Sequence, residues 1–475
     1  MSLARPAAPA LPWRDVTPRE STVAVVGGGF SGLMALVHLA RAMPGARLAL
    51  FERRPLRAPG VAYGGCDRSH LLNVPAARMG AFPDDAGGFH RWLESRRPGA
   101  FRADDFAPRA LFGEYLLDTV SAALAEAGER ISLVRDAAVH VDRLPSRIEL
   151  LLASGRSTVA NAVVVAPGMP PARAPWNRVD HGAPRSALIA DPWEPGAVEG
   201  VDPGAEVLVL GSGLTAIDVA QGLRRAGHVG VIRMVSRNGR LPLPHALPGE
   251  PAAALDAAAL AGGPAAAMHA VHALARARLR ERLGWQAAVD AVRPHASAVW
   301  QSWSPAQRRR FLRHARPAWE VHRHRAPRVV LDDLGRQMLE GTIIVERGAL
   351  AAIHPSGDGM VEAQVKGPDG AWRSYRVARI FNCIGPATGI RDTVDPMLGS
   401  LLRSGLAVED AAGIGLRTGP DGELIDRAGH ADDRVLLIGA LRRGDLWEST
   451  AVPELRVQAA RAAAHVARVL GEGQA

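Results

Sequence analysis

The sequence is poor in lysine and cysteine, and the shortage of lysine excludes two classes of enzyme. Lysine and arginine together number 57 among the 475 residues, but only Lys366 is a lysine. Lys366 does not stand in the phosphate-loop motif G-x-x-x-x-G-K-[ST], so the sequence contains no such motif. This excludes a P-loop NTPase. Schiff-base catalysis would depend on Lys366, which lies in the turn-like segment AQVKGPDG and is poorly placed for it.

The two cysteines, Cys66 and Cys383, exclude further classes of site. They cannot form a disulfide framework, a cysteine-based zinc site or a C-x-x-C redox pair. His322 and His324 are two residues apart, a spacing that does not place both on one helix face. We therefore expect no metal site.

Long apolar runs are also missing. No stretch of about 18 apolar residues occurs without a charge or a helix breaker, and the N-terminus lacks the apolar segment of a secretion signal. We expect a cytoplasmic protein with no membrane partner. The formal net charge of +9 comes from arginines spread among acidic residues, so we expect no nucleic-acid partner, although the charge could attract an acidic substrate. The sequence assigns no oligomeric state.

A glycine fingerprint stands between a strand and a helix near the N-terminus. Residues 22–26 read as a buried strand and residues 33–42 as a helix. The G-x-G-x-x-G motif between them consists of Gly27, Gly28, Gly29, Phe30, Ser31 and Gly32. A second strand, residues 47–51, ends at Glu52, where a βαβ unit places a carboxylate on an adenosine ribose. This pattern predicts a dinucleotide site; the alternative is a structural glycine turn.

The same pattern recurs in the middle of the chain. The strand at residues 206–210 is followed by Gly211, Ser212, Gly213, Leu214 and Thr215 and by a helix at residues 217–226. At the end of the next strand, Ser236 takes the place that Glu52 holds in the first unit. A hydroxyl followed by Arg237 would accept a ribose 2′-phosphate that a carboxylate would repel. NADPH is therefore favoured, and NADH stays open if Arg237 is only a solvent-exposed arginine.

Two such units predict an α/β fold with two Rossmann-type dinucleotide-binding domains, each of three layers, and an α-helical insertion. FAD would occupy the first unit and NADPH the second. Strands ending in glycine, residues 160–168 and 379–385, fit crossovers between the two domains. The expected divisions are a loose arm at 1–20, FAD-binding parts at 21–175 and 381–475, and an NAD(P)H-binding domain at 176–380 with its insertion at about 246–326.

At this point the chain resembles the bacterial two-nucleotide FAD/NAD(P)-binding flavoproteins whose domain is shared by FAD-dependent urate hydroxylases and aspartate N-monooxygenases. The segments that carry the resemblance run over nearly the whole chain and include VAVVGGGFSGLMALVHL, GVAYGGCDRSHLLNVPAARMGAFPDD, VLVLGSGLTAIDVA, SRNGRLPLPH, ARIFNCIG and GALRRGDLWESTAVPELRVQA. The GVAY–LLNVPA and LWE–TAVPE–R segments are more specific than the glycine motifs.

The resemblance implies roles for further residues. Leu72, Asn73 and Val74 would line the isoalloxazine, and Asn73 and Arg78 would lie nearest the reacting atoms. The remaining FAD contacts would come from Gly168, Gly439, Trp447, Glu448 and Thr450. Relatives often carry an aspartate directly after the last-strand glycine, for the ribitol hydroxyl, whereas Ala440 stands here and Asp445 or Glu448 comes later. The backbone amides of the following helix could replace that contact.

The resemblance also implies a reaction. The chain would be an FAD-dependent, NAD(P)H-consuming monooxygenase that hydroxylates a small anionic or nitrogenous substrate, urate-like or an amino acid, with O2 through a flavin C4a-hydroperoxide. Arg293, Arg323 and Arg325 in the insertion are candidate contacts for an anionic substrate. One alternative is an NAD(P)H-dependent flavin reductase or dehydrogenase without oxygen incorporation. A non-catalytic flavin scaffold is a third possibility, but it would not need the second fingerprint.

Overall fold

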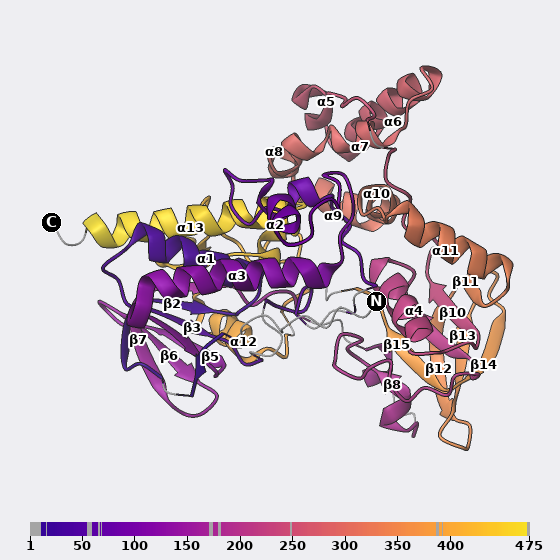
Figure 1. Cartoon of the computed structure of the whole chain (residues 1–475), viewed down its shortest axis with the longest axis horizontal. Helices are drawn as coiled ribbons and strands as arrows, with labels where there is room; N and C mark the ends of the chain where they lie inside the picture. The colour runs from indigo at the N-terminus through magenta and orange to yellow at the C-terminus, as the bar shows by residue number, and fades with distance from the viewer. Residues whose placement is uncertain are drawn as a thin grey trace.

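The computed structural model in Figure 1 contains two sheet-based domains and a separate group of helices. It describes residues 11–15, 17–54, 59–64, 67, 69–170, 174–178, 182–247, 249–385, 389–391 and 393–472. Cys66 and most of the expected N-terminal arm lie outside these residues. Within them, no helix is both long and apolar enough to cross a membrane.

The first domain is built from both ends of the chain around one large sheet. The strands are β1 Trp13–Arg14, β2 Glu20–Val26, β3 Leu48–Phe51, β4 Ile131–Val134, β5 Ala138–Arg143, β6 Ile148–Leu152, β7 Ser157–Val165, β16 Glu423–Ile425 and β17 Ala431–Leu437. The path β1-β4-β3-β2-β7-β17-β16 is parallel except at β16, and the antiparallel β5 and β6 extend from β7. The C-terminal β17 pairs with β7, so chain segments some 270 residues apart complete one sheet.

Helices cover this sheet because its strands are apolar on both faces. The helices of this domain are α1 Phe30–Ala42, α2 Gly88–Arg96, α3 Arg109–Ala127, α12 Pro396–Ser404 and α13 Val452–Glu472. One core joins α1, α3 and α13 to the face that contains Val23 and Val25. A second core joins α12 to the opposite face. Figure 1 shows α13 lying along α1, and the two helices pack against each other.

The second domain repeats the arrangement with five parallel strands in the order β11-β10-β9-β15-β8. Its elements are β8 Leu188–Ile189, β9 Val207–Leu210, α4 Leu214–Arg225, β10 Ile232–Ser236, α11 Arg328–Leu339, β11 Ile343–Arg347, β12 Ala349–Pro355, β13 Val361–Lys366, β14 Trp372–Val377 and β15 Arg379–Asn382. Helices α4 and α11 pack on one face. The third layer is the antiparallel meander β12-β13-β14, whose alternating apolar side chains cover the other face.

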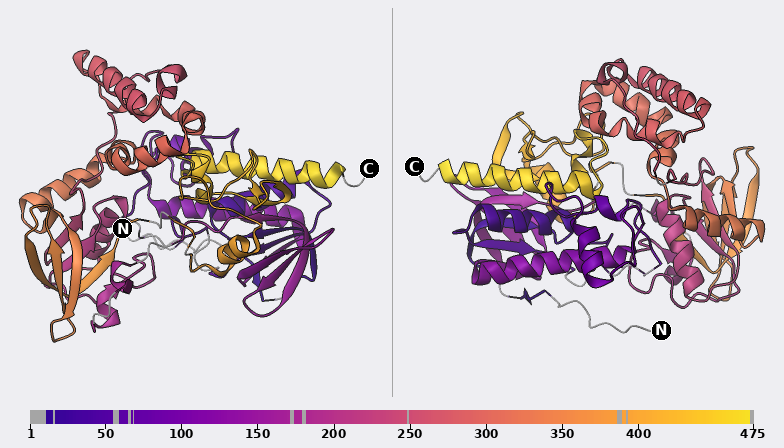
Figure 2. Two further views of the ribbon diagram at one scale, coloured as in Figure 1. Left: turned by 180° about the vertical axis from the view of Figure 1, so that it is seen from behind. Right: turned by 45° about the horizontal axis from the view of Figure 1, so that its top comes forward.

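The insertion leaves the second domain after β10 and returns before α11. Its helices are α5 Ala257–Ala261, α6 Pro264–Arg280, α7 Gln286–Asp290, α8 Ala296–Ser302, α9 Pro305–His314 and α10 Arg316–Arg323. The α/β architecture with a helical insertion is as expected. Figure 2 shows this group standing clear of the five-stranded sheet, and its core includes Trp447 and Ile414 of the first domain.

Two expected boundaries differ from the structure. The arm was expected to be loose through residue 20, but Trp13 and Arg14 form β1 against β4, and Leu11 is buried in the core of the first domain. The second sheet continues past residue 380, because β15 runs to Asn382 and pairs with β9. In both places the sheet extends beyond the residues that the sequence pattern marks as strand, because an apolar side chain is buried there: Leu11 near the first boundary and Phe381 near the second.

Candidate functional site

The first fingerprint forms a turn that leaves one side open for a phosphate. Gly27 has φ +103°, and a Cβ there would lie 2.1 Å from the carbonyl oxygen of Ala166, so only glycine fits. Gly32 packs as closely, because its Cβ would lie 1.9 Å from the Gly27 carbonyl oxygen. Gly29 differs: the nearest atom to its Cβ position would be Gly60 Cα, at 3.9 Å. The closed positions hold the helix against the strand, and the open one admits a pyrophosphate.

The second fingerprint has the same geometry. Gly211 has φ +121°, and its Cβ would lie 2.2 Å from the Cys383 carbonyl oxygen, as Gly27 does with Ala166. No described atom lies within 4 Å of a Cβ placed on Gly213. Gly29 and Gly213 are extended residues at the starts of α1 and α4, and neither helix has a side-chain cap there. The free amides of both helix N-termini fit the phosphates of FAD and of NADPH.

The two units differ where each would meet a ribose. The Glu52 carboxylate accepts hydrogen bonds from the backbone nitrogens of Gly28 and Arg54, both at 2.7 Å. In the second unit the Ser236 hydroxyl is 2.8 Å from the Ser212 hydroxyl, so it supports the turn itself. Arg237 is exposed, and it forms no ion pair with the residues that the structure describes. The free guanidinium suits a 2′-phosphate.

Distant segments meet at the first fingerprint. A Cβ on Gly439, after the C-terminal strand, would lie 3.4 Å from Ser31 Oγ. The Gly439 amide donates to Gln458 Oε1 of α13 at 2.9 Å. Gly168, after β7, has φ +74° and open space around it. The sequence-predicted residues Ser31, Gly439 and Gly27 therefore surround one place at the carboxyl ends of the parallel strands, where this fold class binds ligands.

The segment expected to line the isoalloxazine is held between the domains. Leu72 is buried, Asn73 and Val74 are half-buried, and Arg78 is exposed. His245, which follows β10 in the second domain, lies near enough to the backbone of Asn73 for that backbone to influence its pKa. Burial and, to a smaller extent, the nearby Arg325 guanidinium lower the pKa of His245 to about 4. A neutral imidazole that the sequence argument did not single out thus faces the predicted flavin segment.

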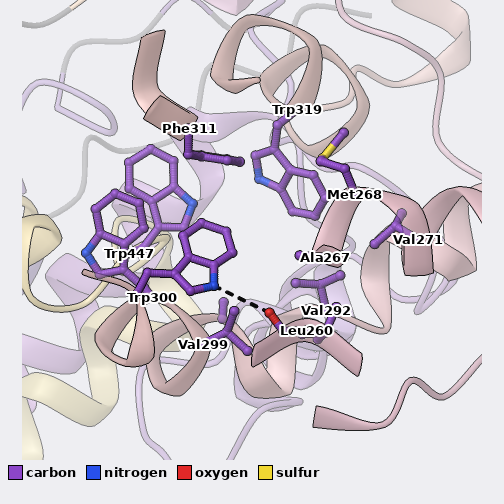
Figure 3. Close-up of a pocket in the computed structure, with 12 residues that line it drawn as sticks. Leu260, Ala267, Met268, Val271, Val292, Val299, Trp300, Phe311, Trp319 and Trp447 are labelled. Atoms are coloured by element: carbon purple, nitrogen blue, oxygen red, sulfur yellow. Dashed lines mark hydrogen bonds between the residues drawn. The ribbon is translucent and has the colours of Figure 1, made fainter. Parts of the chain in front are cut away.

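Trp447 and Glu448 were expected to close over the ribitol, but their side chains contact the insertion. Trp447 stacks on Trp300 with ring centroids 4.7 Å apart. The Glu448 carboxylate accepts hydrogen bonds from Arg323 Nε, at 2.5 Å, and from the Trp319 indole. Figure 3 shows Trp447, Trp300, Phe311 and Trp319 around one apolar cavity of about 40 Å³. The adjacent Thr450 is exposed.

The arginines proposed as contacts for an anionic substrate form ion pairs within the protein. Arg293 pairs with Glu454 at 2.6 Å, Arg323 pairs with Glu448, and Arg325 pairs with Asp290. Each cation is paired with a carboxylate that lies far away in sequence or on another helix, so a direct contact with an anionic substrate stays a prediction. Asp445 is also engaged, since it accepts a hydrogen bond from the Thr418 amide at 2.7 Å. The Arg293–Glu454 and Arg323–Glu448 pairs fasten the insertion to the first domain.

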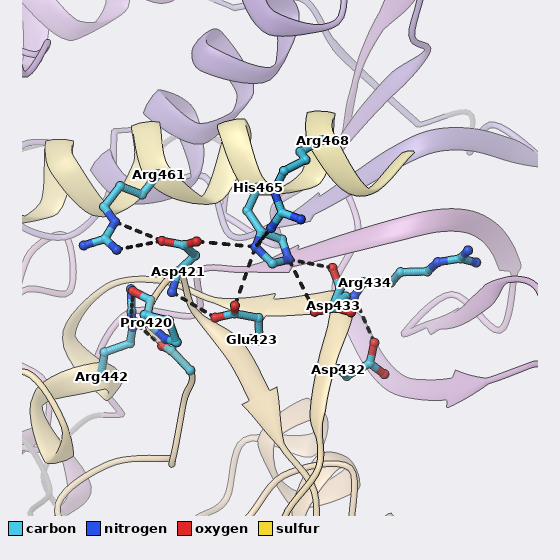
Figure 4. A network of polar contacts seen from close by, with 11 residues as sticks. Pro420, Asp421, Glu423, Asp432, Asp433, Arg434, Arg442, Arg461, His465 and Arg468 are labelled. Atoms are coloured by element: carbon cyan, nitrogen blue, oxygen red, sulfur yellow. Dashed lines mark hydrogen bonds and ion pairs between the residues drawn. The ribbon is translucent and has the colours of Figure 1, made fainter. Parts of the chain in front are cut away.

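A further polar cluster lies away from both fingerprints. Asp421, Glu423 and His465 offer ligand atoms within 4.8 Å of one another. Figure 4 shows Arg461 beside Asp421 and Arg442 beside the Pro420 carbonyl, and Arg461 Nη2 is 2.8 Å from the Asp421 carboxylate. His465 is also 3.2 Å from the Asp433 carbonyl oxygen. The arrangement is an ion-pair network that links α13 to β16, and the arginines supply its positive charge.

The curated relatives are distant and carry no assigned activity. Uncharacterized proteins of Mycobacterium tuberculosis and Mycobacterium bovis are 26% identical over 286 residues. The match covers 48% of this chain and 53% of each relative, so the chain spans about half the length of the curated relatives that it matches.

Solved flavoproteins share the fold over nearly the full length. The ornithine N-hydroxylase of Kutzneria sp. 744 matches with a TM-score of 0.64 at 15% identity, over 95% of this chain and 100% of that one. The L-lysine 6-monooxygenase of Pseudomonas syringae gives 0.62 at 14% identity with the same coverage. The thioredoxin reductase of Lactococcus lactis gives 0.52 at 12%, over 95% of this chain and 99% of that one.

The family comparison agrees with the geometry of the first unit. The matched model is described as FAD-NAD(P)-binding and covers residues 24–170, which include the first fingerprint, Glu52 and the Leu72–Val74 segment. Residues 24–170 are therefore an FAD-NAD(P)-binding domain, in a chain that has the fold of two-nucleotide flavoproteins.

Proposed function

We propose that the chain is an FAD-dependent monooxygenase that takes hydride from NADPH. The observation that carries this proposal is the pair of matching fingerprints, each closed at its first glycine and open at Gly29 or Gly213. A protein that only stored flavin would need one such site. The structural similarity to an ornithine N-hydroxylase and to an L-lysine 6-monooxygenase supports an oxygenase on the same fold.

In this proposal the chemistry that FAD supplies when bound is hydride acceptance from NADPH and activation of O2. The residues of the chain bind and orient the nucleotides. The amides at the start of α1 hold the FAD pyrophosphate, and those at the start of α4 hold that of NADPH. Leu72 and Val74 provide an apolar face beside the ring, and neutral His245 adds no charge there.

A nitrogenous substrate is favoured over an anionic one. Arg293, Arg323 and Arg325, the three cations considered for an anion, are each paired with a carboxylate. Opening such a buried pair would leave a charge unpaired, which is costly. The substrates named for the two similar hydroxylating enzymes, ornithine and lysine, both carry a side-chain amine.

The main alternative is an NAD(P)H-dependent reductase, because thioredoxin reductase shares the fold. A dithiol mechanism would require two neighbouring cysteines, which this sequence does not have. Cys383 is buried, and burial raises the pKa of its thiol, so it is a poor nucleophile. A reductase for an external acceptor remains the second candidate.

The test follows three quantities in one reaction: NADPH consumed, H2O2 released, and the mass of the product. Purified protein should be yellow and should release FAD rather than FMN on denaturation. The candidate substrates are ornithine, lysine, cadaverine, aspartate and urate. With the true substrate of an oxygenase, the product should be heavier by one oxygen atom, and the amount of H2O2 released should be smaller than the amount of NADPH consumed. Colourless protein that takes up no FAD would overturn the proposal. Reduction of an added quinone or dye with no oxygenated product would favour the reductase.

A further inference from the structure

Helix α4 carries one carboxylate on its buried face that nucleotide binding does not explain. Asp218 lies one turn after Leu214, the first residue of the helix, and is 5% exposed among Ile217, Val219 and other apolar side chains. A lone carboxylate in such a place loses much of its hydration. It therefore needs a partner, and the partner comes from the other domain.

Arg109 of the first domain supplies the positive charge. Its Nη1 atom is 2.9 Å from Asp218 Oδ2, and the two side chains are 13% and 8% exposed. Arg109 is the first residue of α3, where the helix dipole disfavours a cation, so its placement there reflects the partner rather than the helix. Trp193 covers the guanidinium at 5.9 Å from its ring centroid.

The same two residues hold the chain just before the predicted flavin segment. Arg109 Nε donates to the Leu71 carbonyl oxygen at 3.1 Å. His70 Nε2 donates to the Asp218 carbonyl oxygen at 2.9 Å, and its ring meets the edge of Trp193. Leu72, Asn73 and Val74 follow directly. Asp218 of α4 therefore holds His70 through its backbone carbonyl, and it reaches Leu71 through Arg109.

We propose that Arg109 and Asp218 are positioning residues that couple the two nucleotide sites, by holding the Leu72–Val74 segment at a fixed place relative to α4. The inference rests on the proposed function, because α4 begins where NADPH would bind. Hydride transfer requires the reacting atoms to approach within about 3–3.5 Å, and small displacements slow it strongly. A buried ion pair between the two sites limits such displacements.

An exposed ion pair across the same interface provides a matched control. Arg225, at the end of α4, pairs with Asp67 of the first domain at 3.1 Å. Their side chains are 53% and 34% exposed, so water and salt screen that pair. If any contact between the domains served equally, Arg225→Gln and Asp218→Asn would have similar effects.

The experiment is anaerobic stopped-flow reduction of the FAD-loaded protein by NADPH, with dithionite reduction and FAD content measured in parallel. Asp218→Asn should lower the limiting reduction rate at least tenfold, while the FAD content, the dithionite reaction and the NADPH concentration at half-saturation stay within twofold. Arg225→Gln should leave all four unchanged. Asp218→Glu should recover part of the rate.

A double variant, Arg109→Met with Asp218→Leu, covers the case in which a single variant does not fold. It removes both charges together and leaves no unpaired ion in the interface. A positioning role predicts that it folds and binds FAD but is still reduced slowly. A return to the normal rate in the double variant, or a normal rate in folded Asp218→Asn, would overturn the coupling. A wild-type protein that binds FAD and is not reduced by NADPH overturns the proposed function as well.

Discussion

The Trp447 ring lies parallel to the Trp300 ring, with centroids 4.7 Å apart and planes inclined by 21°. Trp447 belongs to the segment after the last strand of the FAD-binding domain, whereas Trp300 belongs to the insertion. Beside this stack, Glu448 holds φ +64°, a conformation that costs energy for a residue with a Cβ. The Arg323 and Trp319 hydrogen bonds keep it there. The aromatic stack and this buried carboxylate therefore both dock the insertion on the first domain.

The first prediction concerns that carboxylate. Glu448→Gln leaves Arg323 buried without its counter-charge, and we expect a loss of about 3–5 kcal/mol in the stability of the docked insertion. The Trp300–Trp447 stack should open at lower urea, as measured by tryptophan fluorescence. Glu340→Gln is the control, because its pair with Arg336 is exposed and should change stability by less than about 0.5 kcal/mol. Equal shifts in both variants would argue against docking through Glu448.

The second prediction separates the two nucleotide sites. Gly29→Val and Gly213→Val place side chains in open space at φ −76° and −85°, so both proteins should fold. Gly29→Val should lose FAD, since the valine occupies the pyrophosphate position. Gly213→Val should stay yellow and be bleached by dithionite, but not by NADPH. Reversed results would exchange the assignments of the two sites, and normal NADPH reduction of Gly213→Val would leave the second unit without a nucleotide role.

The third prediction tests the choice of coenzyme. Arg237→Ala should weaken NADPH binding by about 1–3 kcal/mol through loss of a charge-assisted contact with the 2′-phosphate. NADH binding should be unchanged and serves as the internal control. Dissociation constants for both coenzymes can be measured by titration of the oxidised protein. If both coenzymes weaken equally, Arg237 does not read the 2′-phosphate.

Sequence patterns predicted those features of the fold that depend on residues close together in the chain. The strand–glycine–helix order around Gly27 and Gly211 follows from apolar periodicity and from glycine spacing, both of which are local. The antiparallel third layer was not predicted: the sequence placed Lys366 in a turn, but it gave neither the pairing of β13 with β14 nor their place over the sheet. Local patterns do not encode which face a meander covers.

Ion pairs between residues far apart in the sequence could not be predicted from local sequence patterns. Arg293 and Glu454 are separated by 161 residues, and Arg323 and Glu448 by 125, so composition alone made these arginines look available. A weaker signal did exist for the interface pair. Asp218 interrupts an apolar helix face, and Arg109 stands at a helix start where a cation is disfavoured. Each of these unusual positions predicts a partner of opposite charge, but only the three-dimensional structure identifies that partner.

The last prediction follows from His245, whose ring lies 4.5 Å from the Phe106 ring, centroid to centroid. Burial lowers its pKa to about 4, whereas an unfolded histidine has a pKa of about 6.5. Below pH 6.5 the unfolded chain therefore binds a proton that the folded chain refuses. Stability contributed by neutral His245 is fully present above that pH and is lost as the pH falls toward 4.

His245→Gln cannot titrate, so it should flatten this dependence. Between pH 7 and pH 4.5 the free energy of unfolding of the wild type should fall by about 2–3 kcal/mol more than that of the variant, from urea denaturation at each pH. His430→Gln, at a side chain that is 81% exposed, should follow the wild type. Other buried histidines, such as His38 and His228, are present in all three proteins and cancel in the comparison. If His245→Gln and the wild type lose stability in parallel, the imidazole facing Asn73 takes up its proton as freely in the folded protein as in the unfolded chain, and it would not be the neutral group that the proposed flavin site requires.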